Sequence, residues 1–165
     1  MNNALMRPAF TRELAERLIR GESLNLTAPH GLGRRQTVQD LRSILPPEMR
    51  VLYADMKFSL HDFPATLREL CAQAGVYDAE VPNVGKLIMA LAKKSQPTLL
   101  ILHNLDLLRD SPHDPLFDTE LLPHLVAFAG HAHLSLLTVS EDIYPDWALP
   151  CKHIAIPLLE KNGDT

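Results

Sequence analysis

The apolar residues of this chain alternate between two kinds of spacing. Short apolar or alternating runs are separated by longer segments in which apolar residues recur every three or four positions. The first pattern is typical of strands, and the second is typical of helices that bury one face. We expect strands at residues 23–27, 50–55, 98–102, 134–139 and 153–156, and helices at residues 9–20, 34–45, 63–74, 84–94 and 119–129.

The regular alternation of strands and helices predicts the fold class. The run at residues 98–102 is almost entirely apolar, which suits a strand buried on both faces of a parallel sheet. We therefore expect an α/β three-layer sandwich with a five-stranded, mainly parallel sheet and right-handed crossovers. The 165 residues suit one hydrophobic core, so residues 1–165 are taken as a single domain.

Composition and charge exclude several classes of protein. The chain is 46% hydrophobic and 22% charged, which is typical of a globular domain and not of a disordered or fibrous chain. Its formal net charge is −4. This charge gives no independent support to a nucleic-acid partner. Basic residues outnumber acidic ones only in residues 1–50, and that part of the chain holds the candidate anion site.

Cysteine usage and hydropathy indicate where the protein works. Cys71 and Cys151 lie far apart in the sequence and form no disulfide framework. The N-terminal segment lacks the apolar core of a signal peptide, and no run of 18 apolar residues occurs. We therefore expect a cytoplasmic protein without a membrane span.

The loop after the first predicted strand carries the candidate anion site. A P-loop has the pattern G-x-x-x-x-G-K-[ST] between a strand and a helix, and its backbone N–H groups cradle phosphates. Residues 28–35 read Ala-Pro-His-Gly-Leu-Gly-Arg-Arg, with the same spacing. Ala28 stands for the first glycine, Arg34 for the lysine and Arg35 for the hydroxyl residue. Arg34 either holds a phosphate or is, like Arg35, a solvated first-turn residue or a contact to a partner.

This loop resembles the Walker A loop of P-loop ATPases of the AAA+ and STAND kind, which often reads G-P-x-G-x-G-K-[ST]. The resemblance covers residues 10–159 and implies the sheet order 5-1-4-3-2. The strand at 98–102 takes the place of the Walker B strand, and the strand at 134–139 that of the sensor strand. The implied site residues are Ala28, His30, Gly31, Gly33, Arg34 and Arg35 in Walker A, His103, Asn104 and Asp106 at and after Walker B, and Thr138 and Ser140 as sensors.

The departures from the family pattern bear on catalysis. The resemblance implies ATP or ADP as the ligand, but the positions of the two Mg²⁺ ligands hold Arg35 and His103, and that of the general base holds Asn104. Mg²⁺ prefers oxygen ligands, and phosphoryl transfer depends on the metal and on positioning. We therefore expect little or no ATP hydrolysis. The family's C-terminal helical lid is not expected after Ile156.

Three functions stay open at this point. The first is a pseudo-ATPase, a nucleotide-binding module that acts through a protein partner or a larger complex. The second is a working ATPase in which Arg34 replaces the lysine, Asp106 holds Mg²⁺, and Thr37 or Ser140 assists. The third is an unrelated small α/β metal-dependent hydrolase, although no metal site is expected, because the histidines at 124, 131 and 133 form no recognised ligand spacing.

Overall fold

The computed structural model describes residues 5–29, 31–76, 83–93, 96–128, 133–143 and 149–158. Five strands form one sheet in the order β2-β3-β4-β1-β5, and every neighbouring pair is parallel. Read from the other edge, this is the predicted order 5-1-4-3-2. The strands are β1 (Leu24–Thr27), β2 (Arg50–Asp55), β3 (Thr98–His103), β4 (Leu134–Ser140) and β5 (Lys152–Ala155).

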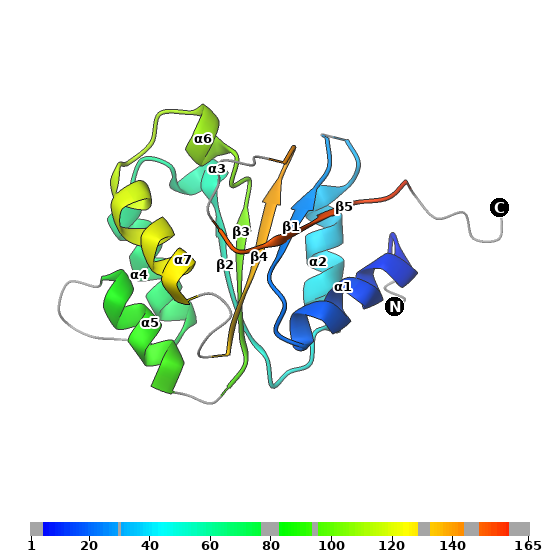
Figure 1. Ribbon diagram of the computed structural model, residues 1–165, viewed down its shortest axis with the longest axis horizontal. Coiled ribbons are helices and arrows are strands. Elements are labelled where there is room, and N and C mark those ends of the chain that lie inside the picture. Colours follow the sequence, from blue (N-terminus) through cyan, green and yellow to red (C-terminus); the bar gives the residue numbers. More distant parts are fainter. Residues whose placement is uncertain are drawn as a thin grey trace.

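Helices cover both faces of the sheet, as the α/β prediction requires (Figure 1). Helices α1 (Pro8–Ile19) and α2 (Arg34–Ile44) lie on one face. Helices α4 (Phe63–Gln73), α5 (Val84–Lys93) and α7 (Leu122–Phe128) lie on the other, and the π-helical turn η1 (Phe117–Leu121) leads into α7. The short helices α3 (Met56–Ser59) and α6 (Leu107–Asp110) lie at the end of the sheet where β2 and β3 terminate. None of the helices in the described part of the chain is long and apolar enough to cross a membrane.

Each face of the sheet has its own apolar core. Along β3, Leu99 and Ile101 belong to the core beneath α1 and α2, whereas Leu100 and Leu102 belong to the core beneath α4, α5 and α7. Successive side chains of a strand point to opposite faces, so a strand covered on both sides needs apolar residues at every position. Each fully buried leucine contributes about 1.5–3 kcal/mol through burial. This explains the uninterrupted apolar run of β3.

The boundaries differ from the prediction in a few places. The first helix begins at Pro8, one residue before the expected start. Proline is tolerated in the first turn because its missing N–H would have no helical partner there. The sequence pattern also missed α3 and α6, because helices of one turn are too short to show a periodicity.

Candidate functional site

The loop after β1 turns sharply into α2 through two glycines. Gly31 and Gly33 have φ values of 92° and 81°, which glycine adopts without the strain that a side chain would bring. Gly33 is also closely packed, since a Cβ atom there would lie 2.7 Å from Sδ of Met6. It immediately precedes Arg34, and no side chain caps the helix. The unsatisfied N–H groups and the dipole of this helix end therefore favour an anion.

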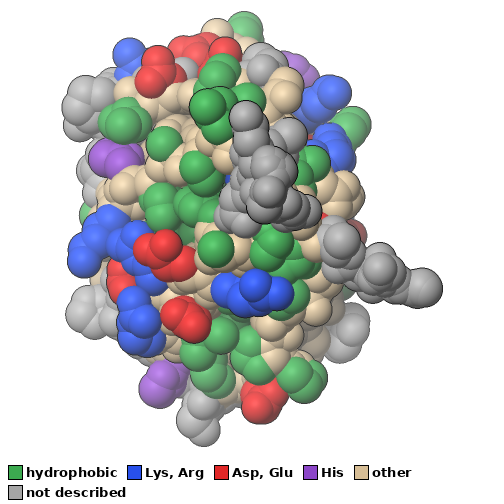
Figure 2. Space-filling view, turned by 90° about the vertical axis from the view of Figure 1, so that its right-hand side faces the viewer, with side chains coloured by type: hydrophobic (Ala, Val, Ile, Leu, Met, Phe, Trp, Pro, Cys, Tyr) green, Lys and Arg blue, Asp and Glu red, His purple; other side chains and the backbone are tan. Residues whose placement is uncertain are grey.

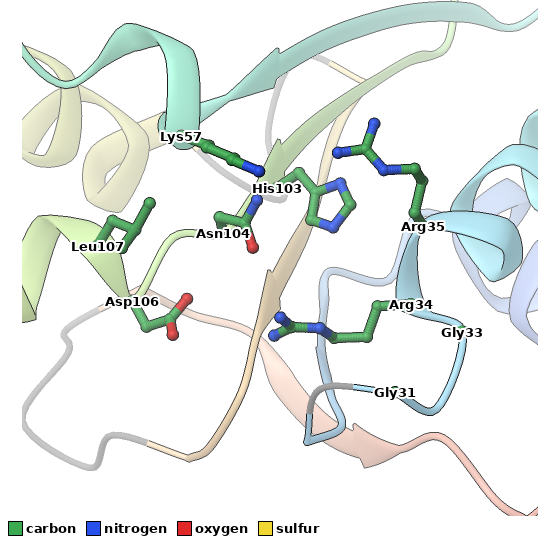
Figure 3. A pocket seen from close by; sticks show the side chains of 9 residues that line it. All are labelled: Gly31, Gly33, Arg34, Arg35, Lys57, His103, Asn104, Asp106 and Leu107. Atoms are coloured by element: carbon green, nitrogen blue, oxygen red, sulfur yellow. The ribbon is translucent and has the colours of Figure 1, made fainter.

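A cavity of about 490 Å³ lies in front of this helix end (Figure 3). Its lining comes from the loop, from α2 and α3, and from the end of β3 and the segment that follows it. The carboxyl ends of parallel strands are where ligands bind in open α/β sheets, and the volume suits a small molecule. The lining residues are Gly31, Gly33, Arg34, Arg35, Lys57, His103, Asn104, Asp106 and Leu107.

The two arginines at the start of α2 have different environments. Arg34 is buried, with 8% of its surface exposed, and its guanidinium extends across the cavity toward Asp106 (Figure 3). The alternative that Arg34 is a solvated residue is therefore wrong. The side chain of Arg35 is 57% exposed, and its Nη2 lies 3.8 Å from Oδ2 of Asp55. Arg34 is thus the buried cation of the site, and Arg35 stands at its rim.

His103 ends β3 as a buried imidazole with 3% of its surface exposed. Its Nδ1 lies 2.9 Å from the hydroxyl of Tyr53. The guanidinium of Arg42 lies over the Tyr53 ring, with Cζ 5.0 Å from the ring centroid. Burial lowers the pKa of His103; nearby Arg34 and Arg35 lower it further, and Asp55 acts in the opposite direction. The imidazole is therefore neutral at pH 7. It does not supply the negative charge that a carboxylate would bring to the cavity.

Asn104 is held against Asp55 at the end of the neighbouring strand. Asn104 has a left-handed φ of 59°, and its Nδ2 donates to Oδ1 of Asp55 at 2.8 Å. The same oxygen accepts from the backbone N–H of Lys57 at 2.9 Å, which caps α3. The Asp55 carboxylate thus holds together the ends of β2 and β3 through Oδ1. Its buried Oδ2 has no hydrogen-bond partner among the described residues and lies 3.8 Å from Nη2 of Arg35.

Asp106 lines the cavity opposite Arg34 (Figure 3). It is 9% exposed, and its Oδ1 is buried without a hydrogen-bond partner among the described residues. Burial raises the pKa of Asp106, whereas backbone hydrogen bonds at Asp106 and Glu141 and the charge of Arg34 lower it. Asp106 comes three residues after His103, which stands at the Walker B position. The turn after β3 nevertheless directs Asp106 to the cavity.

The two residues suggested as sensors do not line this cavity. Nδ2 of Asn25 donates to Oγ1 of Thr138 at 2.9 Å and to Oγ of Ser140 at 3.2 Å, and the Ser140 hydroxyl donates to the backbone of Asp142 at 2.9 Å. Both hydroxyls are buried in a polar network that continues from Oδ1 of Asn25 to Nδ1 of His153. Their role as sensors stays a prediction.

The remaining candidates from the sequence add no metal site. In the described part of the chain, no group of three or more His, Cys, Asp or Glu side chains is placed to hold a metal ion. His124 bonds through Nδ1 to the backbone oxygen of Glu120 at 2.7 Å. His30 and His131 lie outside the described residues. Ala28 is buried with 3% of its surface exposed, so the apolar residue that replaces the first glycine is part of the core.

The residues present do not fit Mg²⁺. The resemblance implies a hydroxyl at position 35 and a carboxylate at position 103, but these positions hold the cation Arg35 and the neutral His103. The cations Arg34, Arg35 and Lys57 all line the cavity, and Asp106 is the carboxylate among the lining residues. A Mg²⁺ ion would therefore enter an already positive site with few of the oxygen ligands that it requires.

Two functional candidates, Asp55 and Lys57, were not singled out from the sequence. Asp55 ends β2 and Lys57 comes two residues later. The fold places β2 directly beside β3, with Asp55 paired in register to His103. The sequence could have indicated them, because polar residues at the carboxyl ends of adjacent parallel strands lie together at one edge of the sheet. Using it required the strand order, which came only from the resemblance.

We expect the protein to become less stable as the pH falls, because His103 becomes protonated. The folded pKa of His103 lies below its ordinary value of 6.5, so the unfolded chain binds this proton first as pH falls. The wild-type protein should therefore lose stability as pH drops below 6.5 toward the folded pKa, and His103→Asn, which does not titrate, should lose less. Urea unfolding between about pH 8 and about pH 5 measures the difference. If the free energy of unfolding changes equally with pH in the two proteins, the pKa of His103 is the same in the folded and unfolded states and the prediction is wrong.

No protein-family model matches the sequence, and no curated protein matches it either. Several solved structures do match. A structure of Cdc6p from Pyrobaculum aerophilum superimposes with a TM-score of 0.67 at 15% identity, covering 93% of this chain and 46% of that one. ORC1 of Aeropyrum pernix, solved in complex with DNA, gives 0.66 at 17% identity, covering 95% and 46%. ORC2 of Aeropyrum pernix, solved as ADPNP-ADP complexes, gives 0.53 at 17% identity, covering 90% and 46%.

These similarities concern the fold. The chain spans about half the length of the solved structures that it matches, and the identities are low. What this chain shares with them is its fold, a five-stranded all-parallel sheet with helices around it. The chain therefore has an α/β, P-loop NTPase-like fold that matches the fold of these Cdc6 and ORC structures.

Proposed function

We propose that this protein is a nucleotide-binding module of the AAA+ type that holds ATP or ADP without Mg²⁺ and without turnover. The observation that carries the proposal is the buried guanidinium of Arg34, which stands at the lysine position of the P-loop and extends into a cavity at a helix N-terminus. Arginine binds phosphate well through its planar pair of donors. The loop and the helix end add backbone N–H groups.

The absence of hydrolysis follows from the groups that replace the catalytic ones. The general-base position holds Asn104, whose amide donates to Asp55 at 2.8 Å and takes up no proton at neutral pH. The two Mg²⁺ positions hold a cation and a neutral imidazole. Phosphoryl transfer without a metal and a base loses most of its electrostatic stabilisation. Such a module would act by changing its contacts with a partner when nucleotide binds.

We further propose that the partner is a protein and that the complex is cytoplasmic. The solved neighbours include Drosophila ORC bound to AT-rich DNA and Cdc6, so membership of an assembly with other proteins fits this fold. On the face in Figure 2, basic, acidic and apolar side chains are interspersed and form no continuous basic stripe. Cys71 and Cys151 are free thiols, as a reducing compartment favours.

Calorimetric titration with ATP and with ADP, each with and without Mg²⁺, tests the proposal. We expect binding in the micromolar range that does not require Mg²⁺. Arg34→Ala should weaken it about 10- to 100-fold, because hydrogen bonds to a charged group contribute about 1.5–3 kcal/mol. Arg34→Lys should retain part of the affinity as a point charge. A matched control is Arg12→Ala, which removes an exposed arginine from α1.

The outcome that would contradict the proposal is equally clear. If neither nucleotide binds the wild-type protein, the loop is a relic or a protein contact.

A working ATPase is the second candidate, because Asp106 does line the cavity. That function requires binding and phosphate release to depend on Mg²⁺, and a coupled phosphate assay on the same samples would reveal it.

A further inference from the structure

We infer that this cavity selects a nucleoside diphosphate over a triphosphate, and that Asp106 is the residue that discriminates. The inference rests on the proposed function, since it concerns which nucleotide the same site prefers. Asp106 and Arg34 face one another across the cavity from opposite walls, one from the segment after β3 and one from the first turn of α2 (Figure 3).

The P-loop geometry places the terminal phosphates of a nucleotide near Arg34. The residue at this position reaches the β- and γ-phosphates, while the loop and helix end hold the phosphates nearer the ribose. Arg34 extends away from the helix end toward Asp106. A third phosphate held by the Arg34 guanidinium would therefore enter the end of the cavity that Asp106 lines.

Asp106 is poorly suited to receive that phosphate. It is 9% exposed, and its buried Oδ1 has no hydrogen-bond partner among the described residues, so water screens it little. Charges of like sign repel more strongly in such an environment than in bulk water. In ATPases a metal ion neutralises the terminal phosphate, but the residues at the two usual ligand positions here do not fit one. A γ-phosphate would meet the carboxylate directly.

A diphosphate avoids this repulsion. Its two phosphates can occupy the helix end and the near side of the Arg34 guanidinium, and the far side of that guanidinium stays turned toward Asp106. Lys57 and Arg35 also line the cavity and add favourable charge for either nucleotide. Asp106 is therefore the lining group that treats the two nucleotides differently, and it acts through repulsion of the wrong ligand.

The test compares ADP and ATP titrations of the wild-type protein and of Asp106→Asn, in EDTA and in Mg²⁺. Asn keeps the shape of the side chain and removes its charge. In EDTA we expect the wild-type protein to bind ADP at least about tenfold more tightly than ATP, since like-charge contacts are strongly unfavourable. Asp106→Asn should tighten ATP binding about tenfold and leave ADP binding within about threefold. Asp110→Asn is the matched control, because it removes an exposed carboxylate four residues away.

The outcomes separate this inference from the function on which it rests. Equal binding of ADP and ATP that is lost in Arg34→Ala would overturn the diphosphate preference and keep the nucleotide site. An ATP preference that appears only with Mg²⁺ and disappears in Asp106→Asn would overturn it in favour of a metal-binding Asp106. A preference for ADP that Asp106→Asn does not change would assign the selection to another residue. No binding of either nucleotide would overturn both.

Discussion

Replacing Arg7 by methionine should lower the free energy of unfolding by about 3–5 kcal/mol. Arg7 is 1% exposed, which is exceptional for an arginine, and it lies just before α1. Its guanidinium donates to the backbone oxygens of Leu32 at 2.8 Å and Pro157 at 2.7 Å, and to Oγ1 of Thr37 at 3.2 Å. Methionine fills similar space but removes all three hydrogen bonds and leaves the buried Thr37 hydroxyl without this donor, and a buried group left unsatisfied costs about 1–3 kcal/mol.

The same contacts join three distant segments beneath the candidate site. Leu32 lies in the loop that cradles the cavity, Thr37 is in α2, and Pro157 follows β5. Urea unfolding of Arg7→Met measures the effect, with Arg12→Met as the control, since Arg12 is exposed on α1 and should change stability by less than about 0.5 kcal/mol. A loss below about 1 kcal/mol for Arg7→Met would mean that water replaces these hydrogen bonds at little cost.

Replacing Phe117 by alanine should cost about 3–5 kcal/mol, the usual range for deleting a large buried aromatic side chain. Phe117 is fully buried at the start of η1. Its ring meets that of Phe63 edge to face, with centroids 5.0 Å apart and planes at 85°. Such a pair adds about 0.5–1.5 kcal/mol beyond burial, and it anchors the segment between α6 and α7 to α4.

Thermal or urea unfolding of Phe117→Ala tests this expectation, with Phe117→Leu as an intermediate that keeps most of the apolar volume. Phe58→Ala is the exposed control, because Phe58 on α3 is 76% exposed and its removal should change stability by about 0.5 kcal/mol or less. Equal losses for Phe117→Ala and Phe58→Ala would show that η1 is not anchored through its aromatic ring.

The strand and helix order could be predicted because both periodicities are local. Each apolar run or helical repeat lies within about a dozen residues, and burial of both sheet faces made the run at β3 continuous. The parallel sheet followed from the alternation of elements, whereas the strand order came from the resemblance carried by the loop at residues 28–35. The short helices α3 and α6 could not be predicted, since one turn holds no period.

The candidate site was predicted only in part, for a physical reason. The loop, with Gly31, Gly33 and Arg34, is contiguous in the sequence, so its spacing is visible there. Asp55 and Lys57 reach the site because β2 pairs with β3 in register, and no local pattern contains that pairing.

The sequence alone determined that this chain is an α/β protein with a glycine-containing turn of P-loop spacing after its first strand, because helix and strand periodicities and glycine spacing are properties of neighbouring residues. The tertiary structure decided that Arg34 is buried while Arg35 is exposed, and that Asp106 faces Arg34 across the cavity. It also decided that Arg7 is buried beneath the loop. Burial and facing depend on which distant segments pack together, and packing is determined only when the whole sheet is assembled.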